Sequence, residues 1–189
     1  IFDVFGTAVG MLCMCRDVTV ERQLEKKIIY SANTDQLTDL YNRRYFYEYM
    51  TRHKIMSKHV NLFYIDLDNF KKINDEYGHQ AGDTVLVMVA GLLKQTFGAE
   101  FIARVGGDEF LAVVLGSKTD AELAILAERF LSSLQQTIAD NAKFSVLSAS
   151  IGIAVSNALT DVDLLIRQSD SALYEAKRNG KKQYKIYHK

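Results

Sequence analysis

Hydrophobic and polar residues follow two patterns along the chain, one with the period of a helix and one with the period of a strand. Apolar residues at helical spacing predict helices over residues 43–57, 81–97, 120–139 and 163–178. Alternating or continuous apolar runs predict strands over residues 60–66, 144–155 and 184–187. Helices and strands in this order predict an α/β domain with a mostly antiparallel central sheet flanked by helices.

Two more strands are expected around the sequence Gly-Gly-Asp-Glu at positions 106–109, which separates two apolar runs. A pair of glycines accepts positive φ angles without a Cβ clash, so the segment predicts a tight hairpin with two carboxylates at its tip. Neighbouring carboxylates repel each other unless a cation lies beside them, which makes the tip a candidate metal site. A solvated turn that carries ordinary surface acids is the alternative.

A second polar segment begins where the strand over residues 60–66 ends, at Asp66, and continues to Asp83. It combines carboxylates with lysines, an amide and a histidine. Oxygen ligands together with ammonium groups are what a magnesium-bound polyphosphate requires. If this strand lies beside the hairpin, Asp66 and Asp108 can share a metal ion.

The N-terminal part of the chain has a different pattern. Residues 1–15 alternate loosely and fit the end of a β-hairpin, and Val20, Leu24 and Ile28 then recur at helical spacing. A strand and a helix packed on the main domain are the alternative. Cys13 and Cys15 are too few for a zinc site, so we interpret them as small buried residues in a reducing compartment.

Composition limits the possible partners. The 189 residues suggest one domain with a short appendage, large enough to bury a core without disulfides. A net charge of zero gives no electrostatic reason to expect a nucleic-acid partner or an anionic membrane surface. No apolar run approaches the roughly 20 residues of a membrane helix. We therefore expect no direct membrane contact from this chain, which begins without Met and is interpreted as a cytoplasmic fragment, or as the cytoplasmic part of a larger, membrane-attached sensor.

Three segments, taken together, resemble the GGDEF family of diguanylate cyclases. They are the signature Arg104–Phe110, the stretch from Asp66 to Asp83, and the opening motif at residues 35–46. The resemblance covers residues 35–189 and implies a palm-like nucleotide cyclase fold. Residues 1–17 look like the end of a PAS sensor domain, and residues 18–34 look like its helical signalling linker.

The resemblance also implies an activity: condensation of two GTP molecules into cyclic di-GMP and two pyrophosphates, at the interface of a homodimer, in bacterial signalling. A catalytically silent GTP-binding regulatory module is one alternative, and a pure dimerisation domain driven by the helix at residues 20–30 is another. Intact acidic residues at the hairpin favour the enzyme, since a silent module has no need of metal ligands.

The resemblance assigns a role to each matched position. It implies that Asp66, Asp108 and the backbone carbonyl of Leu67 bind Mg²⁺, with Mn²⁺ as an alternative, and that Asp108 and Glu109 are catalytic. It further implies that the substrate is bound by Lys71, Asn74, His79, Asp83, Gly106, Gly107, Lys177 and Lys181. Within this set, Asn74 and Asp83 would recognise guanine, since a carboxylate accepts from its N1–H and amino group.

Several of these residues have structural alternatives, and one family feature is missing. Asn74 fits a helix cap, Asp83 fits a first-turn residue that interacts with the helix macrodipole, and the C-terminal lysines fit a solvated helix end. Many family members carry Arg-x-x-Asp before the hairpin, where product binds and inhibits. Here those positions hold Phe97 and Glu100, so we expect no tight inhibitory site on the surface.

Overall fold

The computed structural model of the protein describes residues 4–7, 17–56, 59–98, 101–156 and 161–188. The chain divides into two compact units, Ile1–Ala32 and Asn33–Lys189. Most of the segment expected to be a PAS remnant, including Cys13 and Cys15, lies outside the described residues. The linker contains helix α1 (Thr19–Asn33), which buries none of its residues. Its apolar residues Val20, Leu24 and Ile28 are 66%, 54% and 68% exposed.

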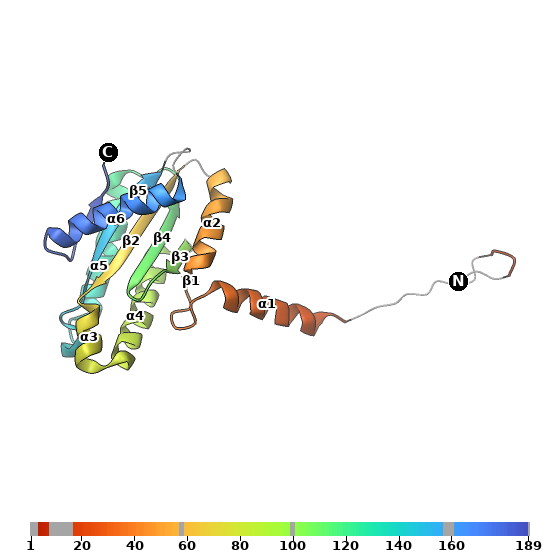
Figure 1. Ribbon diagram of the computed structural model, residues 1–189, viewed down its shortest axis with the longest axis horizontal. Coiled ribbons are helices and arrows are strands. Elements are labelled where there is room, and N and C mark those ends of the chain that lie inside the picture. The colour runs from red at the N-terminus through yellow and green to blue at the C-terminus, as the bar shows by residue number, and fades with distance from the viewer. Residues whose placement is uncertain (1–3, 8–16, 57–58, 99–100, 157–160, 189) are drawn as a thin grey trace. The chain divides into compact units, whose positions relative to one another are not determined.

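A six-stranded sheet with the order β1-β3-β4-β2-β5-β6 forms the centre of the second unit (Figure 1). Its strands are β1 (Tyr41–Asn42), β2 (Val60–Asp68), β3 (Phe101–Arg104), β4 (Glu109–Leu115), β5 (Ser148–Ser156) and β6 (Tyr184–Ile186). The four central strands are antiparallel, while the short edge strands β1 and β6 run parallel to their neighbours. The predicted sheet, mostly antiparallel, is therefore confirmed.

Helices cover both faces of this sheet, because its strands are apolar on both sides. They are α2 (Arg43–Met56), α3 (Phe70–Tyr77), α4 (His79–Phe97), α5 (Asp120–Ile138) and α6 (Val162–Arg178). Phe63, Ile65 and Leu67 of β2 pack in one core with α3, α4 and α5. Leu62 and Tyr64 pack on the opposite face with residues of α2 and α6. Asp66 has the parity of Leu62 and Tyr64, so it lies on the α2–α6 face.

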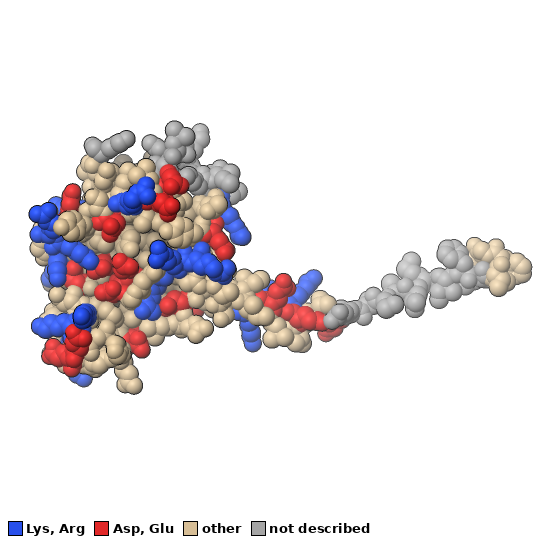
Figure 2. Space-filling model, in the orientation of Figure 1, with Lys and Arg blue, Asp and Glu red and all other residues tan. Residues whose placement is uncertain are grey.

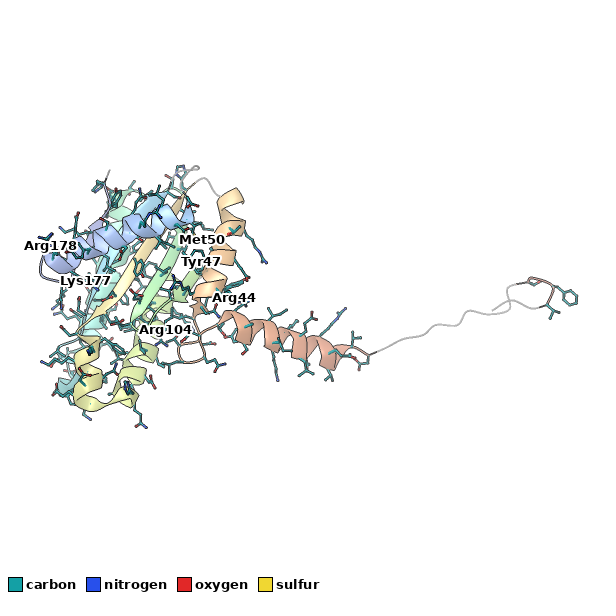
Figure 3. The ribbon with its side chains drawn as sticks, in the orientation of Figure 1. Arg44, Tyr47, Met50, Arg104, Lys177 and Arg178 are labelled. Atoms are coloured by element: carbon teal, nitrogen blue, oxygen red, sulfur yellow. The ribbon has the colours of Figure 1, made fainter. Side chains whose placement is uncertain are left out.

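The packing of α6 on the sheet depends on one glycine. A Cβ atom at Gly152 of β5 would collide with the backbone of Ser169 and Leu173 in α6. The missing side chain lets this helix approach the sheet at van der Waals distance. Figure 3 shows that α6 carries Lys177 and Arg178 at its C-terminal end.

The sequence analysis did not predict α3 or β1, ended the strand β2 at Asp66 instead of Asp68, and misplaced the start of two other elements. The strand expected from residue 144 begins at Ser148, and Phe144 ends a short 3₁₀ helix that starts at Ala142. Phe144 and Leu147 are buried without belonging to a strand, so apolar spacing alone placed the boundary too early. The helix expected from residue 81 begins at His79, directly after Gly78, whose φ of 81° favours glycine and separates α3 from α4.

Charged residues are interspersed on the face of the second unit seen in Figure 2, in keeping with the net charge of zero. Among the described residues, no helix is both long enough and apolar enough to cross a membrane.

Candidate active site

The end of β2 and the β3–β4 hairpin lie side by side, so the two polar segments of the sequence meet. Asp66 is paired with Glu109 across the antiparallel β2–β4 ladder. The backbone N–H of Leu67 donates to the carbonyl of Asp108 over 3.2 Å, which ties the strand end to the hairpin tip. This adjacency is the condition under which Asp66 and Asp108 can serve one site.

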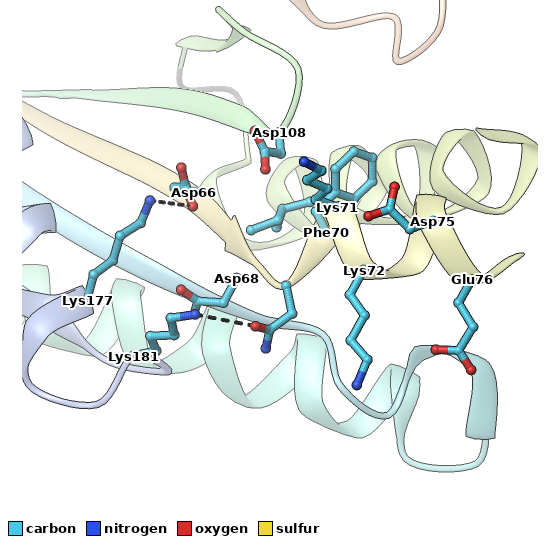
Figure 4. Close-up of a pocket in the computed structure, with 12 residues that line it drawn as sticks. Asp66, Asp68, Phe70, Lys71, Lys72, Asp75, Glu76, Asp108, Lys177 and Lys181 are labelled. Carbon is cyan, nitrogen blue, oxygen red and sulfur yellow. Dashed lines mark hydrogen bonds and ion pairs between the residues drawn. The ribbon is translucent and has the colours of Figure 1, made fainter. Parts of the chain in front are cut away.

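A cleft of about 790 Å³ opens at this junction (Figure 4). The described residues that line it are Asp66, Leu67, Asp68, Asn69, Phe70, Lys71, Lys72, Asp75, Glu76, Asp108, Lys177 and Lys181. Six of the twelve are residues that the sequence assigned to metal or phosphate: Asp66, Leu67, Lys71, Asp108, Lys177 and Lys181. The cleft therefore collects carboxylates and ammonium groups in one place.

The carboxylates of the cleft are in unequal environments. Lys177 Nζ lies 2.8 Å from Asp66 Oδ1, so Asp66 is paired with an ammonium group. Burial raises the pKa of the Asp108 carboxyl above its ordinary value, and the negative charge of Asp66 raises it further. Lys177 and Arg104 oppose this rise without cancelling it. Asp108 would therefore gain from a cation placed beside it.

Asp68 has a structural role that sequence analysis did not find. Asp68 is 3% exposed. It accepts hydrogen bonds from the hydroxyls of Ser148 and Ser150 at 2.8 and 2.9 Å and from the N–H of Lys182 at 3.3 Å. These bonds join β2, β5 and the chain after α6. The signal in the sequence is the two-residue spacing from Asp66, which places both acids on one face of the strand.

Helix α3 begins at the cleft without a side-chain cap. Asn69 precedes it with a φ of 63°, and its amide is occupied elsewhere: Nδ2 donates to the carbonyl of Val146 at 2.8 Å, and Oδ1 accepts from Lys181 Nζ at 3.3 Å. Phe70 and Lys71, the first two residues of α3, line the cleft. First-turn N–H groups and the positive end of the helix dipole favour an anion at such a position.

The donor set fits a divalent ion that arrives with phosphates. Among the described residues, no three acidic, histidine or cysteine side chains are grouped to hold a metal. Two carboxylates, Asp66 and Asp108, do line one cleft, and Leu67 can offer only its backbone carbonyl because its side chain has no ligand atom. Mg²⁺ in nucleotide sites is commonly held by one or two carboxylates plus the substrate phosphates.

Glu109 is not among the described residues that line the cleft. It lies with Tyr64 beside a cavity of about 60 Å³ that Arg43 and Ile166 also line. Burial raises the pKa of Tyr64, and the charge of Glu109 raises it further, so the phenol stays protonated and can donate. The structure thus separates Asp108, at the cleft, from Glu109, which faces α2 and α6.

Of the two hairpin glycines, only Gly106 is required by its surroundings, and for a reason other than the one predicted. Neither Gly106 nor Gly107 has a positive φ angle. A Cβ atom at Gly106 would instead collide with the carboxylate of Glu109, whereas one at Gly107 would meet no atom within 4 Å. Neither is among the described residues that line the cleft. Space for a neighbouring side chain, rather than backbone conformation, explains the first glycine.

Arg104 holds the hairpin in place, a role that sequence analysis missed (Figure 3). Its Nε and Nη2 donate to the carbonyl of Gly107 at 3.2 and 2.8 Å, and its Nη1 donates to the two carboxylate oxygens of Asp35 at 3.1 and 3.3 Å. Burial opposes the charge of Asp35, but hydrogen bonds from Thr38 and Arg104 outweigh it and lower its pKa. We call Asp35, Arg104 and Gly107 the arginine bridge.

The residues assigned to guanine lie at the corner between α3 and α4, outside the cleft lining of the described residues. The side-chain amide of Asn74 lies directly over Gly82, the residue before Asp83, where a Cβ atom would collide with it. His79 is the exposed first residue of α4. Asp83 is exposed and lies beyond the first turn of α4, so the macrodipole alternative for it is wrong. Asn74 is half-buried within α3 and does not cap it.

Comparison with known proteins gives consistent matches. The family described as "Diguanylate cyclase, GGDEF domain" matches residues 32–183. The signaling protein YkoW of Bacillus subtilis is 36% identical, over 92% of this chain and 23% of its own length. The diguanylate cyclase DgcM of Escherichia coli is 33% identical, over 95% of this chain and 44% of its own length. The cyclic di-GMP phosphodiesterase PdeR of Escherichia coli is 35% identical, over 94% of this chain and 27% of its own length.

The chain thus spans less than half the length of each of these three relatives. Among solved structures, the coiled coil and GGDEF domain of DgcB from Caulobacter crescentus, in complex with c-di-GMP, matches with a TM-score of 0.82 and 26% identity. That match covers 89% of this chain and 93% of the DgcB chain. The predicted palm-like fold is therefore confirmed. With its family match over residues 32–183 and relatives of this similarity, the chain belongs to the GGDEF family of diguanylate cyclase domains.

Proposed function

We propose that this domain condenses two GTP molecules into cyclic di-GMP and two pyrophosphates. The observation that carries the proposal is the cleft itself, which combines Asp66 and Asp108 with the uncapped start of α3 and several lysines. Lys71 and Lys181 would bind phosphate oxygens, together with the first N–H groups of α3. Relatives named diguanylate cyclase, such as DgcM, support the assignment.

Asp66, Asp108 and the backbone of Leu67 would hold Mg²⁺, with Mn²⁺ as the alternative. When bound, such an ion would neutralise phosphate charge and lower the pKa of the attacking 3′-hydroxyl. Glu109, the second acid that the resemblance makes catalytic, would act from the other side of the hairpin, beside Tyr64. Gly106 would serve indirectly, by leaving room for the Glu109 carboxylate.

Guanine would be recognised at the α3–α4 corner by Asn74 and Asp83, with His79 nearby. Adenine lacks the paired N1–H and amino donors, so ATP would leave the Asp83 carboxylate unpaired at a cost of ~1–3 kcal/mol. GTP should therefore be used in preference to ATP, and Asp83→Ala should narrow the difference. Equal use of both nucleotides by the unmodified protein would contradict this assignment.

Catalysis would require a homodimer, because the reaction joins two nucleotides and each chain would present one of them. The exposed stripe of Val20, Leu24 and Ile28 on α1 is suited to parallel pairing with a second copy. The similarity to a DgcB structure that includes a coiled coil supports this arrangement. Leu24→Glu should lower activity in dilute protein and affect concentrated protein less.

Regulation by product should differ from that in family members with the Arg-x-x-Asp motif. Phe97, at the arginine position, is 4% exposed and packs edge-on against Phe63 with ring centroids 5.0 Å apart. Glu100 lies outside the described residues. We therefore propose that cyclic di-GMP competes with GTP at the active site alone. Tight product binding that persists with a non-hydrolysable GTP analogue bound would contradict this proposal.

A catalytically silent GTP-binding module is the second candidate, favoured by two observations. Glu109 is turned toward Tyr64 rather than into the cleft, and a relative named as a phosphodiesterase, PdeR, matches 94% of the chain. Incubation of the protein with GTP and Mg²⁺, followed by chromatography for cyclic di-GMP, separates the candidates. Product formation that is lost in Asp108→Asn supports the cyclase, whereas GTP binding without product supports the silent module.

A further inference from the structure

Lys177 and Lys181 are both cations of the cleft, but they have different partners. Lys177 Nζ is 2.8 Å from Asp66 Oδ1, and the two side chains are 36% and 13% exposed. Lys181 Nζ donates to the neutral amide oxygen of Asn69 at 3.3 Å. Only Lys177 of this pair therefore neutralises a carboxylate that the proposed function gives to the metal (Figure 4).

The ion pair of Lys177 has an energetic reason. Asp66 and Asp108 line the same cleft, and the charge of Asp66 raises the pKa of Asp108. A largely buried carboxylate next to a second one is costly unless a cation compensates it. The ammonium group of Lys177 supplies that cation from α6, whose neighbouring residue Ala176 is buried and anchors the helix end.

An ammonium group and a divalent ion cannot share Asp66 on equal terms. Mg²⁺ approaches its oxygen ligands to about 2.0–2.1 Å and requires near-octahedral geometry. The ammonium group of Lys177 occupies Oδ1 of that carboxylate and repels a second cation placed beside it. A metal ion on Asp66 is therefore left with Oδ2 and lies close to the ammonium charge of Lys177, so its binding is favoured when Lys177 moves to another anion.

We propose that Lys177 is an exchangeable counterion, which holds Asp66 in the nucleotide-free protein and moves to a phosphate when the metal–nucleotide complex arrives. The inference rests on the proposed function and extends it to the order of binding. The divalent ion alone binds weakly, because it either meets the charge of Lys177 beside Asp66 or leaves that ammonium group without its carboxylate. The ion with a triphosphate binds more tightly, because the phosphates accept Lys177, so metal and nucleotide promote each other's binding.

The test measures metal binding without turnover. Mn²⁺ is titrated into nucleotide-free protein and the free ion is followed by electron paramagnetic resonance. Lys177→Gln should bind Mn²⁺ about fivefold more tightly than the unmodified protein, the scale of a partly exposed ion pair. Lys181→Gln is the matched control, because it removes the same charge from the same cleft without touching Asp66. Its affinity should change less than about twofold.

Two further measurements complete the design. Lys177→Arg keeps the charge and should keep the low Mn²⁺ affinity, which excludes a loss of folding as the explanation. A non-hydrolysable GTP analogue should tighten Mn²⁺ binding to the unmodified protein, and much less to Lys177→Gln. Equal Mn²⁺ affinities for the Lys177→Gln and Lys181→Gln variants would overturn the inference. Failure of the unmodified protein to produce cyclic di-GMP, with these affinities as expected, would refute the proposed reaction and leave the exchange intact.

Discussion

The arginine bridge gives a prediction whose size follows from its geometry. Arg104 makes four donor contacts of 2.8–3.3 Å with Asp35 and Gly107, and the side chains of Arg104 and Asp35 are 15% and 26% exposed. Hydrogen bonds to charged groups contribute about 1.5–3 kcal/mol when shielded from water. Because this pair is partly solvated, we expect Arg104→Gln to lower the free energy of unfolding by about 2 kcal/mol.

A second ion pair of the same fold provides the control. Lys118 and Glu122 are 3.6 Å apart at i,i+4 spacing, with side chains 35% and 50% exposed. Lys118→Gln should cost about 0.5 kcal/mol or less. For a domain of this size, the expected loss for Arg104→Gln corresponds to roughly 4–8 °C in Tm. Urea and thermal unfolding of the whole chain measure both variants under identical conditions.

Activity and coupling provide separate checks on the bridge. The freed carbonyl of Gly107 precedes Asp108, so kcat should fall roughly ten- to a hundredfold, which is the scale of a small misplacement of a catalytic group. A double-mutant cycle with Asp35→Asn should show a coupling of about 1 kcal/mol, since the two residues are in direct contact. The reasoning is refuted if Arg104→Gln is no more destabilising than Lys118→Gln, or if the coupling with Asp35 is absent.

Three other predictions concern the hairpin and its surroundings. Asp108→Asn should cut turnover at least ~10²-fold. It should also raise the Tm of the metal-free protein, because the raised pKa of Asp108 means that the folded state disfavours its ionised carboxyl. A lower Tm than that of the unmodified protein, measured in EDTA, would contradict this. The pKa of Asp35 is lowered, so its stabilising effect is present above the unfolded value of about 4 and disappears as pH falls further. Asp35→Asn should accordingly have a lower free energy of unfolding than the unmodified protein at pH 7. Urea unfolding at a series of decreasing pH values should show that difference disappear. Gly106→Ala should reduce turnover more than Gly107→Ala in parallel assays, because only the former collides with Glu109.

Most elements could be predicted in their order because hydrophobic periodicity reports which faces are buried, but the short helix α3 and the two-residue strand β1 were missed. The helices at α2, α5 and α6 and the strand β2 follow their apolar spacing closely. The boundary at Ser148 was wrong because Phe144 is buried by a 3₁₀ turn, and spacing cannot separate burial in a turn from burial in a strand. The cleft was predictable in composition, since Asp66, Asp108 and three lysines were chosen from motifs.

The orientation of side chains within the site was beyond the sequence, because tertiary contacts decide it. The ion pair of Lys177 with Asp66 joins residues that are far apart along the chain. The direction of Glu109 follows from Tyr64, which faces it from the neighbouring strand. The bonds between Asp68 and the serines of β5 depend on the register of two strands, which no local pattern specifies.

The contact between Gly152 and α6 restricts how the site can adapt. With no side chain between sheet and helix, α6 has no room to settle deeper, and any larger residue at position 152 would lift it away. The backbone of α6 therefore keeps Lys177 at a fixed distance from the sheet. The ammonium group can move only by rotation of its own side chain. The length of the Lys177 side chain thus determines which anions of the cleft its ammonium group can reach. A larger residue at position 152, which lies within the sheet, would move α6 and so change which anions Lys177 can contact.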